Sequence, residues 1–109
     1  MSSDLKAVVT DANLHYNGSI SIDADLLQSA DIREFEQVDV YNITNGERLT
    51  TYAIIGKPGE ICLNGAAARK AEPGDRVIIA SYAIYGAEEL DRFEPKVILL
   101  DETNKPIST

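Results

Sequence analysis

The chain has few of the residues that build disulfides and metal centres. Its 109 residues include one cysteine, Cys62, and one histidine, His15. A single cysteine excludes an internal disulfide and is typical of a reducing compartment, so a cytoplasmic protein is expected. No Cys-x-x-Cys or His-x-x-x-His spacing occurs, and two isolated ligands do not predict a metal site.

Basic residues and long apolar runs are also scarce. The chain carries 10 lysines and arginines against 18 acidic residues, a formal net charge of −8. This balance disfavours nucleic acid as a partner, because such binding depends on cations that neutralise phosphates. A small anionic substrate would need its own lysine or arginine at the binding site. No apolar run approaches the length of a membrane span, and the first residues show no export signal.

The residues that are present predict a small β protein. A hydrophobic fraction of 44% over 109 residues predicts one domain, residues 1–109, with one core. Strands are expected over residues 6–10, 19–22, 38–43, 48–55, 61–63, 76–84 and 96–100. Short helices are expected over 24–30, where Asp23 can cap the first turn, over 65–70 and over 87–93. Turns are expected over 11–13 and at Asn45-Gly46, and a frayed polar tail over 101–109. This pattern is typical of a mainly β fold, a compact β-barrel with short helices.

The segment Leu14-His15-Tyr16-Asn17-Gly18-Ser19-Ile20 supports two interpretations. Asn17-Gly18 between two β-prone runs predicts a tight hairpin, in which Ser19 only begins the next strand. The other interpretation is covalent. The Ser19 hydroxyl can attack the Gly18 carbonyl, which glycine leaves open, and β-elimination of the resulting ester would cut the chain. The new N-terminus would then become a pyruvoyl group.

Two further segments carry candidate site residues. In a strand over 48–55, alternation places Arg48, Thr50 and Tyr52 on one face and Thr51 on the other. Asn64 is followed by glycine and three alanines, small residues that let backbone N–H groups approach a ligand. An exposed barrel strand and an ordinary loop explain these two segments equally well.

Taken together, these segments resemble the aspartate 1-decarboxylase family, small pyruvoyl enzymes that make β-alanine for pantothenate and coenzyme A biosynthesis. The resemblance covers nearly the whole chain. It rests on Thr10-Asp11-Ala12-Asn13-Leu14-His15-Tyr16, Gly18-Ser19, Thr44-Asn45-Gly46-Glu47-Arg48, Thr51-Tyr52, Leu63-Asn64-Gly65-Ala66-Ala67-Ala68, Gly74-Asp75 and Val77-Ile78-Ile79-Ala80-Ser81-Tyr82. It implies a six-stranded double-psi β-barrel with short capping helices, assembled as a homotetramer with active sites between subunits.

The resemblance also implies a reaction. Self-cleavage at Gly18-Ser19 would give a β-chain of residues 1–18 and an α-chain of residues 19–109, with or without a maturation factor. The pyruvoyl group derived from Ser19 would form a Schiff base with the amine of L-aspartate, without metal or pyridoxal phosphate. The implied roles are cleavage for Thr51, proton donation for Tyr52, carboxylate binding for Arg48, and the pocket for Asn64, Gly65, Ala66, Ala67 and Tyr16.

One departure from the family pattern concerns substrate binding. The family carries a lysine in its first strand, followed two residues later by a histidine, and gapless alignment places Ser3 and Leu5 there. Lys6 does not replace the lysine, because an offset of three residues along a strand turns the side chain to the opposite face. The alternatives are therefore a non-catalytic or poorly processed paralogue and a pyruvoyl decarboxylase for another amino acid.

Overall fold

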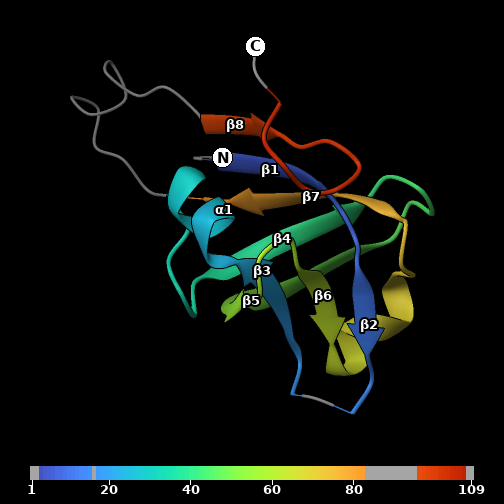
Figure 1. Ribbon diagram of the computed structural model, residues 1–109. Helices are drawn as coiled ribbons and strands as arrows, with labels where there is room; N and C mark the ends of the chain where they lie inside the picture. The colour runs from blue at the N-terminus through green and yellow to red at the C-terminus, as the bar shows by residue number, and fades with distance from the viewer. Residues whose placement is uncertain (1–2, 16, 83–95, 108–109) are drawn as a thin grey trace.

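The computed structural model describes residues 3–15, 17–82 and 96–107 (Figure 1). These residues form eight strands in the hydrogen-bonded order β2-β6-β3-β5-β4-β7-β1-β8 and two short helices. The strands are β1 (Ser3–Val8), β2 (Asp11–Asn13), β3 (Ser19–Asp23), β4 (Gln37–Asn42), β5 (Arg48–Gly56), β6 (Ile61–Asn64), β7 (Arg76–Ser81) and β8 (Lys96–Leu99). The helices are α1 (Ala24–Ser29) and the 3-10 helix η1 (Gly65–Lys70). The predicted mainly β fold is confirmed.

Some sequence-based expectations differ from the structure, and others concern residues outside the described ranges. The segment 11–13, expected as a turn, forms strand β2 and pairs with β6, which raises the strand count above the implied six. The strand predicted over 76–84 ends at Ser81 as β7. The helix predicted over 87–93 and the side chain of Tyr16 lie outside the described residues.

Strand β3 is positioned by neighbours on both sides. It runs parallel to β5 and antiparallel to β6, and β2 pairs with the other edge of β6. Strand β6 therefore lies between β2 and β3, the strands on either side of the Asn17-Gly18 pair (Figure 1). The hairpin predicted at Asn17-Gly18 is wrong, because β6 takes the strand hydrogen bonds of both flanking segments. Gly18 also lacks the positive φ of such a turn.

The second Asn-Gly pair does form the predicted turn. Strands β4 and β5 pair antiparallel on either side of it. Gly46 has a φ of +79°, and its N–H donates to the Asn42 carbonyl at 2.8 Å. Glycine reaches this left-handed conformation at little steric cost. The turn fixes the register that places Arg48 opposite Tyr41.

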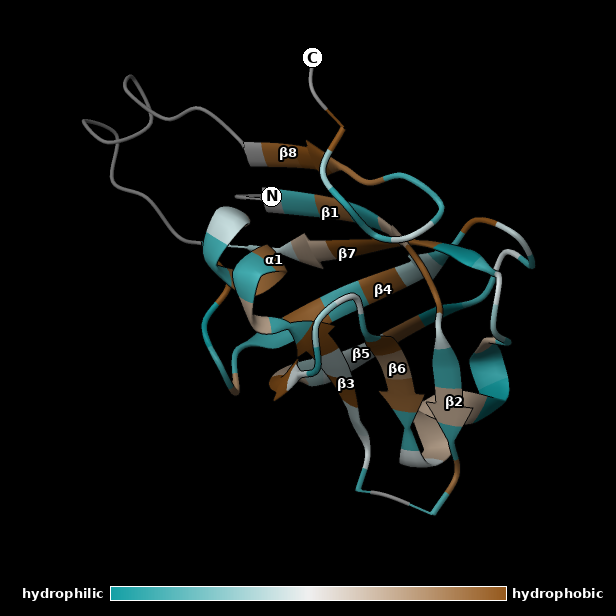
Figure 2. Cartoon of the chain, in the orientation of Figure 1, coloured by the Kyte–Doolittle hydropathy of each residue, from teal (hydrophilic) through white to brown (hydrophobic). Residues whose placement is uncertain are grey.

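The core follows the alternation of the strands (Figure 2). Leu5, Ile79 and Val40 form one row across β1, β7 and β4, and all three are fully buried. Lys6 follows Leu5 in β1 and is exposed, as alternation requires. The two residues therefore lie on opposite faces, and Lys6 cannot occupy the position of the absent first-strand lysine.

Helix α1 begins as predicted after Asp23. The Asp23 carboxylate accepts a hydrogen bond from the Asp25 N–H at 2.8 Å, which satisfies a donor of the first helical turn. Its other oxygen accepts from the Gly59 N–H at 2.7 Å. Leu26 and Leu27 are buried in the core. The cap therefore joins α1 to the loop before β6.

The segment after β8 returns to the sheet rather than fraying from residue 101. Asn104 is 2% exposed and has a φ of +61°. Its amide oxygen accepts from the Val8 N–H at 2.7 Å, and its amide nitrogen donates to the carbonyls of Val8 at 2.8 Å and Gly59 at 3.1 Å. The expected fraying is therefore wrong for this turn, because the Asn104 side chain pairs with the Val8 backbone beyond the end of the β1–β8 pairing.

Replacing Asn104 with alanine is expected to lower the free energy of unfolding by roughly 1–3 kcal/mol, because the Val8 backbone groups lose their partners. Urea denaturation measures this change. Asn104→Gly separates the hydrogen bonds from the backbone conformation, since glycine accepts positive φ freely. A glycine variant as stable as the unmodified chain would show that these hydrogen bonds contribute nothing.

Candidate active site

Ser19 and Gly18 differ sharply in exposure. Ser19 is 1% exposed at the start of β3, whereas Gly18 is exposed. Apart from the two chain neighbours, no heavy atom of the described residues lies within 4 Å of the position that a Gly18 Cβ would occupy. The Ser19 hydroxyl donates to the Asn17 carbonyl at 3.0 Å. The hydroxyl is thus fixed beneath the surface, beside a peptide unit with open space on one side.

Asn64 holds the Ser19 hydroxyl from the neighbouring strand. It lies directly opposite Ser19 in the antiparallel register of β3 and β6. Its amide nitrogen donates to the hydroxyl oxygens of Ser19 and Ser21, each at 3.0 Å. Its amide oxygen accepts from the Cys62 thiol at 3.3 Å. With contacts at both ends, the amide is fixed in one orientation, with its N–H groups toward Ser19.

Cys62 belongs to this buried network and is held in its neutral form. Burial raises the pKa of the thiol above the ordinary value of 9.0, and the carboxylates of Asp11 and Glu60 raise it further. A hydrogen bond to the backbone of Asn13 lowers the pKa, and this effect is the smallest of the four. At neutral pH Cys62 is therefore an S–H donor to Asn64.

A cavity of about 440 Å³ brings several of the predicted residues together. Its wall is formed by Gly18, Leu49, Thr50, Thr51, Tyr52, Ala66, Ala67 and Lys70. Strand β5 and helix η1 supply most of the wall, and Gly18, the residue before β3, completes it. Asn64 and Gly65, also predicted to form the pocket, are buried and are not among the residues that line this cavity. The predicted cleavage position, the predicted processing threonine and the predicted proton donor thus share one cavity.

Arg48 lies in an adjoining depression rather than in this cavity. Its guanidinium carbon is 5.2 Å from the centre of the Tyr41 ring, a cation–π contact. The depression, about 290 Å³, is lined by Asp39, Tyr41, Arg48, Leu49 and Thr50. Leu49 and Thr50 contribute to both spaces, so the two adjoin along β5.

Sequence reasoning missed two members of the site. Cys62 lies two residues before Asn64 in a strand, so both side chains can meet on one face, and this spacing is a usable signal. Lys70 lies three residues after Ala67, and side chains three apart are eclipsed in a 3-10 helix. That signal depends on knowing that residues 65–70 form a 3-10 helix rather than an α-helix.

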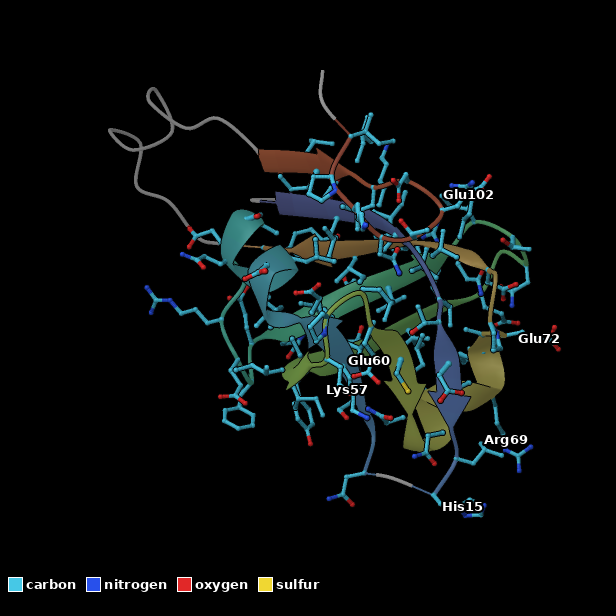
Figure 3. The ribbon with its side chains drawn as sticks, in the orientation of Figure 1. His15, Lys57, Glu60, Arg69, Glu72 and Glu102 are labelled. Atoms are coloured by element: carbon cyan, nitrogen blue, oxygen red, sulfur yellow. The ribbon has the colours of Figure 1, made fainter. Side chains whose placement is uncertain are left out.

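Other kinds of site find no support in the part of the chain that the structure describes. Within residues 3–15, 17–82 and 96–107, no three histidine, cysteine or acidic side chains gather as metal ligands. No helix in those ranges is long and apolar enough to cross a membrane. Figure 3 shows His15 at the outer tip of the loop after β2, where it is exposed. His15 makes no contact with Ser19 that would support a serine–histidine pair.

The fold and the site define a class of protein: a small β-sheet protein with a buried serine, fixed by an asparagine, next to an exposed glycine at a cavity. The comparisons identify the family. The aspartate decarboxylase family model matches residues 1–107, and the chain belongs to that family.

Curated relatives agree with this assignment along almost the whole chain. The aspartate 1-decarboxylase of Syntrophobacter fumaroxidans is 54% identical over 105 residues, which cover 94% of this chain and 85% of the relative. That of Thermoanaerobacter pseudethanolicus is 55% identical, covering 94% and 90%. That of a Hydrogenobaculum strain is 57% identical over 99 residues, covering 91% and 79%.

Cys62→Ser is expected to reduce the loss of stability at alkaline pH. The folded state retains the thiol proton to higher pH than the unfolded state, which releases it near the ordinary value of 9.0. The thiol therefore contributes stability that is fully present below that pH and is lost as the pH rises toward the folded pKa. Serine keeps a donor for Asn64 but does not titrate in this range.

Urea denaturation of both proteins from pH ~7 to ~10.5 measures the difference, because other alkaline titrations are common to the two chains. As the pH rises, the unfolding free energy of the unmodified protein should fall more than that of Cys62→Ser. A gap that is independent of pH would contradict the assignment.

Proposed function

We propose that this chain cleaves itself at Gly18-Ser19 and, in its cleaved form, decarboxylates L-aspartate to β-alanine and carbon dioxide. The single observation that carries the proposal is the pairing of the Ser19 hydroxyl with Asn64 directly beside exposed Gly18. Family membership and the 54–57% identity to curated aspartate 1-decarboxylases favour this activity over a non-catalytic paralogue. The product belongs to pantothenate and coenzyme A biosynthesis.

The residues present fit the formation of a pyruvoyl group from Ser19. The Ser19 oxygen attacks the Gly18 carbonyl carbon, the amide C–N bond breaks, and the hydroxyl proton passes to the released nitrogen. Elimination removes the Ser19 Cα proton and breaks the Cβ–O bond, leaving a Gly18 carboxylate and dehydroalanine. Water then converts dehydroalanine to the pyruvoyl group and releases ammonia. The Asn64 amide fixes the attacking oxygen at the start of this sequence.

The hydrogen bonds of the Ser19 hydroxyl also bear on the rate of cleavage. Its proton faces the Asn17 carbonyl, and its oxygen accepts from the Asn64 amide. Neither partner is a general base at neutral pH. We propose that unaided cleavage is slow for this reason, which leaves a role for a maturation factor.

Once formed, the pyruvoyl group takes up the substrate amine and withdraws electrons as carbon dioxide leaves. We propose that Thr51 supports cleavage and that the Tyr52 hydroxyl returns a proton to the carbon that lost carbon dioxide. Both residues line the cavity with Gly18. Tyr52 is 37% exposed, so its hydroxyl can exchange its proton with solvent between turnovers.

Assembly completes the proposal. We propose that residues 1–109 form one double-psi β-barrel domain, cleaved into chains 1–18 and 19–109, and that four copies form a cytoplasmic homotetramer. Large apolar side chains exposed on the described residues support an assembly, among them Phe35, Ile55 and Tyr82. Sites between subunits would let Arg48 bind a substrate carboxylate, although in its own chain it faces Tyr41.

Ser19→Ala is expected to abolish cleavage, because alanine has no oxygen to attack the Gly18 carbonyl. Intact-mass spectrometry under denaturing conditions should show two fragments for the unmodified protein, the larger with a mass that fits an N-terminal pyruvoyl group. The variant should remain one species of 11.9 kDa. Ser21→Ala is the matched control, since Ser21 shares the Asn64 amide but does not follow a glycine. An unmodified protein that stays intact after prolonged warming would contradict self-cleavage.

Thr51→Val and Tyr52→Phe are expected to separate processing from turnover. Thr51→Val keeps shape but loses the hydroxyl, so the cleaved fraction should fall. Tyr52→Phe should cleave normally and lose about 10²–10⁴-fold in kcat, the usual contribution of a positioned proton donor. Mass spectrometry gives the first quantity and β-alanine release from L-aspartate the second. A Tyr52→Phe enzyme with unchanged kcat would assign the proton to another donor.

Because the first-strand lysine is absent, the alternative function is a pyruvoyl decarboxylase that acts on another amino acid. Parallel assays of the cleaved protein with L-aspartate, L-glutamate and L-alanine distinguish the two. Preference for L-aspartate supports the proposed function, and higher kcat/KM for either of the others overturns the assignment of substrate.

A further inference from the structure

The proposed substrate requires a local cation. L-Aspartate carries two carboxylates, and the chain has a net charge of −8, so the overall field repels it. The first strand does not supply this cation on its inner face, since Leu5 is fully buried and Lys6 is exposed on the opposite face. Arg48 lines the adjoining depression, where it packs on Tyr41.

Helix η1 places a lysine in the cavity itself. Ala67 and Lys70 both line the cavity that contains Gly18, as expected for residues three apart in a 3-10 helix. Arg69, the neighbouring cation, is exposed and points away from the body of the protein (Figure 3). Among the described residues that form this wall, Lys70 is the one with a cationic side chain.

The position of Lys70 is fixed through its backbone. Its carbonyl oxygen accepts hydrogen bonds from the amide nitrogens of Asn42 at 3.0 Å and Asn45 at 2.9 Å. Asn42 is 3% exposed and also binds Asp75, so the turn before β5 anchors the end of η1. These bonds involve the main chain of residue 70 and do not depend on its side chain.

The ammonium of Lys70 already binds a carboxylate. Its Nζ lies 2.8 Å from Glu47 Oε2, and the two side chains are 44% and 49% exposed. An ion pair this exposed is weak, so a second carboxylate can displace Glu47. The contact shows that Nζ can bind a carboxylate from the backbone position that η1 gives to residue 70.

We infer that Lys70 binds the side-chain carboxylate of the substrate, the group that β-alanine retains, and so selects an acidic substrate. This inference rests on the proposed function. A cation is useful at the retained carboxylate rather than at the departing one. Charge disperses as carbon dioxide forms, so a cation there would stabilise the ground state more than the transition state. Lys70 thus supplies the positive charge that the inner face of β1 does not.

The test combines ligand binding with kinetics. Succinate has two carboxylates and no amine, so calorimetry with succinate reports carboxylate recognition without the reaction. In Lys70→Gln, succinate should bind about 10-fold or more weakly, and KM for L-aspartate should rise by a similar factor, as expected for one charge-assisted hydrogen bond. The kcat should change less than KM. Lys70→Arg keeps the charge and should retain most of the affinity.

Arg69→Gln is the matched control, because it removes one positive charge from the same helix end without altering the cavity wall. It should bind succinate and L-aspartate as the unmodified protein does. A Lys70 that only balances the helix dipole would lower the unfolding free energy when replaced and leave succinate binding unchanged. The cleaved fraction of each variant, from mass spectrometry, shows that processing is equal.

Three results would overturn the inference: no succinate binding by the unmodified protein, unchanged binding in Lys70→Gln, or an equal loss in Arg69→Gln. Failure of the proposed function looks different. Succinate would then bind in a manner that depends on Lys70, while L-aspartate yields no β-alanine.

Discussion

The pairing of β3 with the buried strand β6 is the constraint on which the site depends. β6 lies between β2 and β3 and places Asn64 opposite Ser19. The Asn64 amide binds two serine hydroxyls and a thiol, all within the protein interior. A shift of this register by one residue would turn Asn64 to the other face and leave the Ser19 hydroxyl without its donor. The geometry beside Gly18 is therefore a consequence of strand register.

Burial of this network has a stability role as well as a chemical one. A buried polar group costs free energy unless it is paired, and each described member of the network has a partner. Cys62 contributes as a neutral donor, because burial and two carboxylates oppose its ionisation. The same contacts that satisfy these groups hold the reactive hydroxyl in place. Under the proposed function, core packing and preparation for cleavage would involve the same side chains.

The charge of the molecule makes substrate recognition a local problem. An acidic chain gains no long-range attraction for a dicarboxylate, so recognition depends on individual cations at the cavity. Lys70 at the end of η1 lines the cavity, Arg48 lines the adjoining depression, and Lys6 is exposed on β1. Under the proposed function, helix η1 rather than β1 would supply the charge.

The sequence alone determined the features that depend on short-range chemistry. Alternation predicted β3, β4 and β5, the Asp23 cap predicted α1, and Asn45-Gly46 predicted its turn, because each depends on residues within a few positions of one another. Several separated motifs, in the same order and at matching spacing, indicated the family. The resemblance to the family also indicated Gly18, Ser19, Thr51 and Tyr52 as site residues.

Only the tertiary structure decided the features that depend on distant partners. Asn17-Gly18 has the local chemistry of a hairpin, yet β6, more than 40 residues later, separates the flanking strands. Asn104 holds the polar tail against β1, because its side chain pairs with the Val8 backbone beyond the end of the β1–β8 pairing. Lys70 enters the cavity through the 3-10 geometry of η1, and Arg48 is directed to Tyr41 by the β4–β5 register. Local sequence sets the preference of each segment, and long-range packing decides which preference is realised.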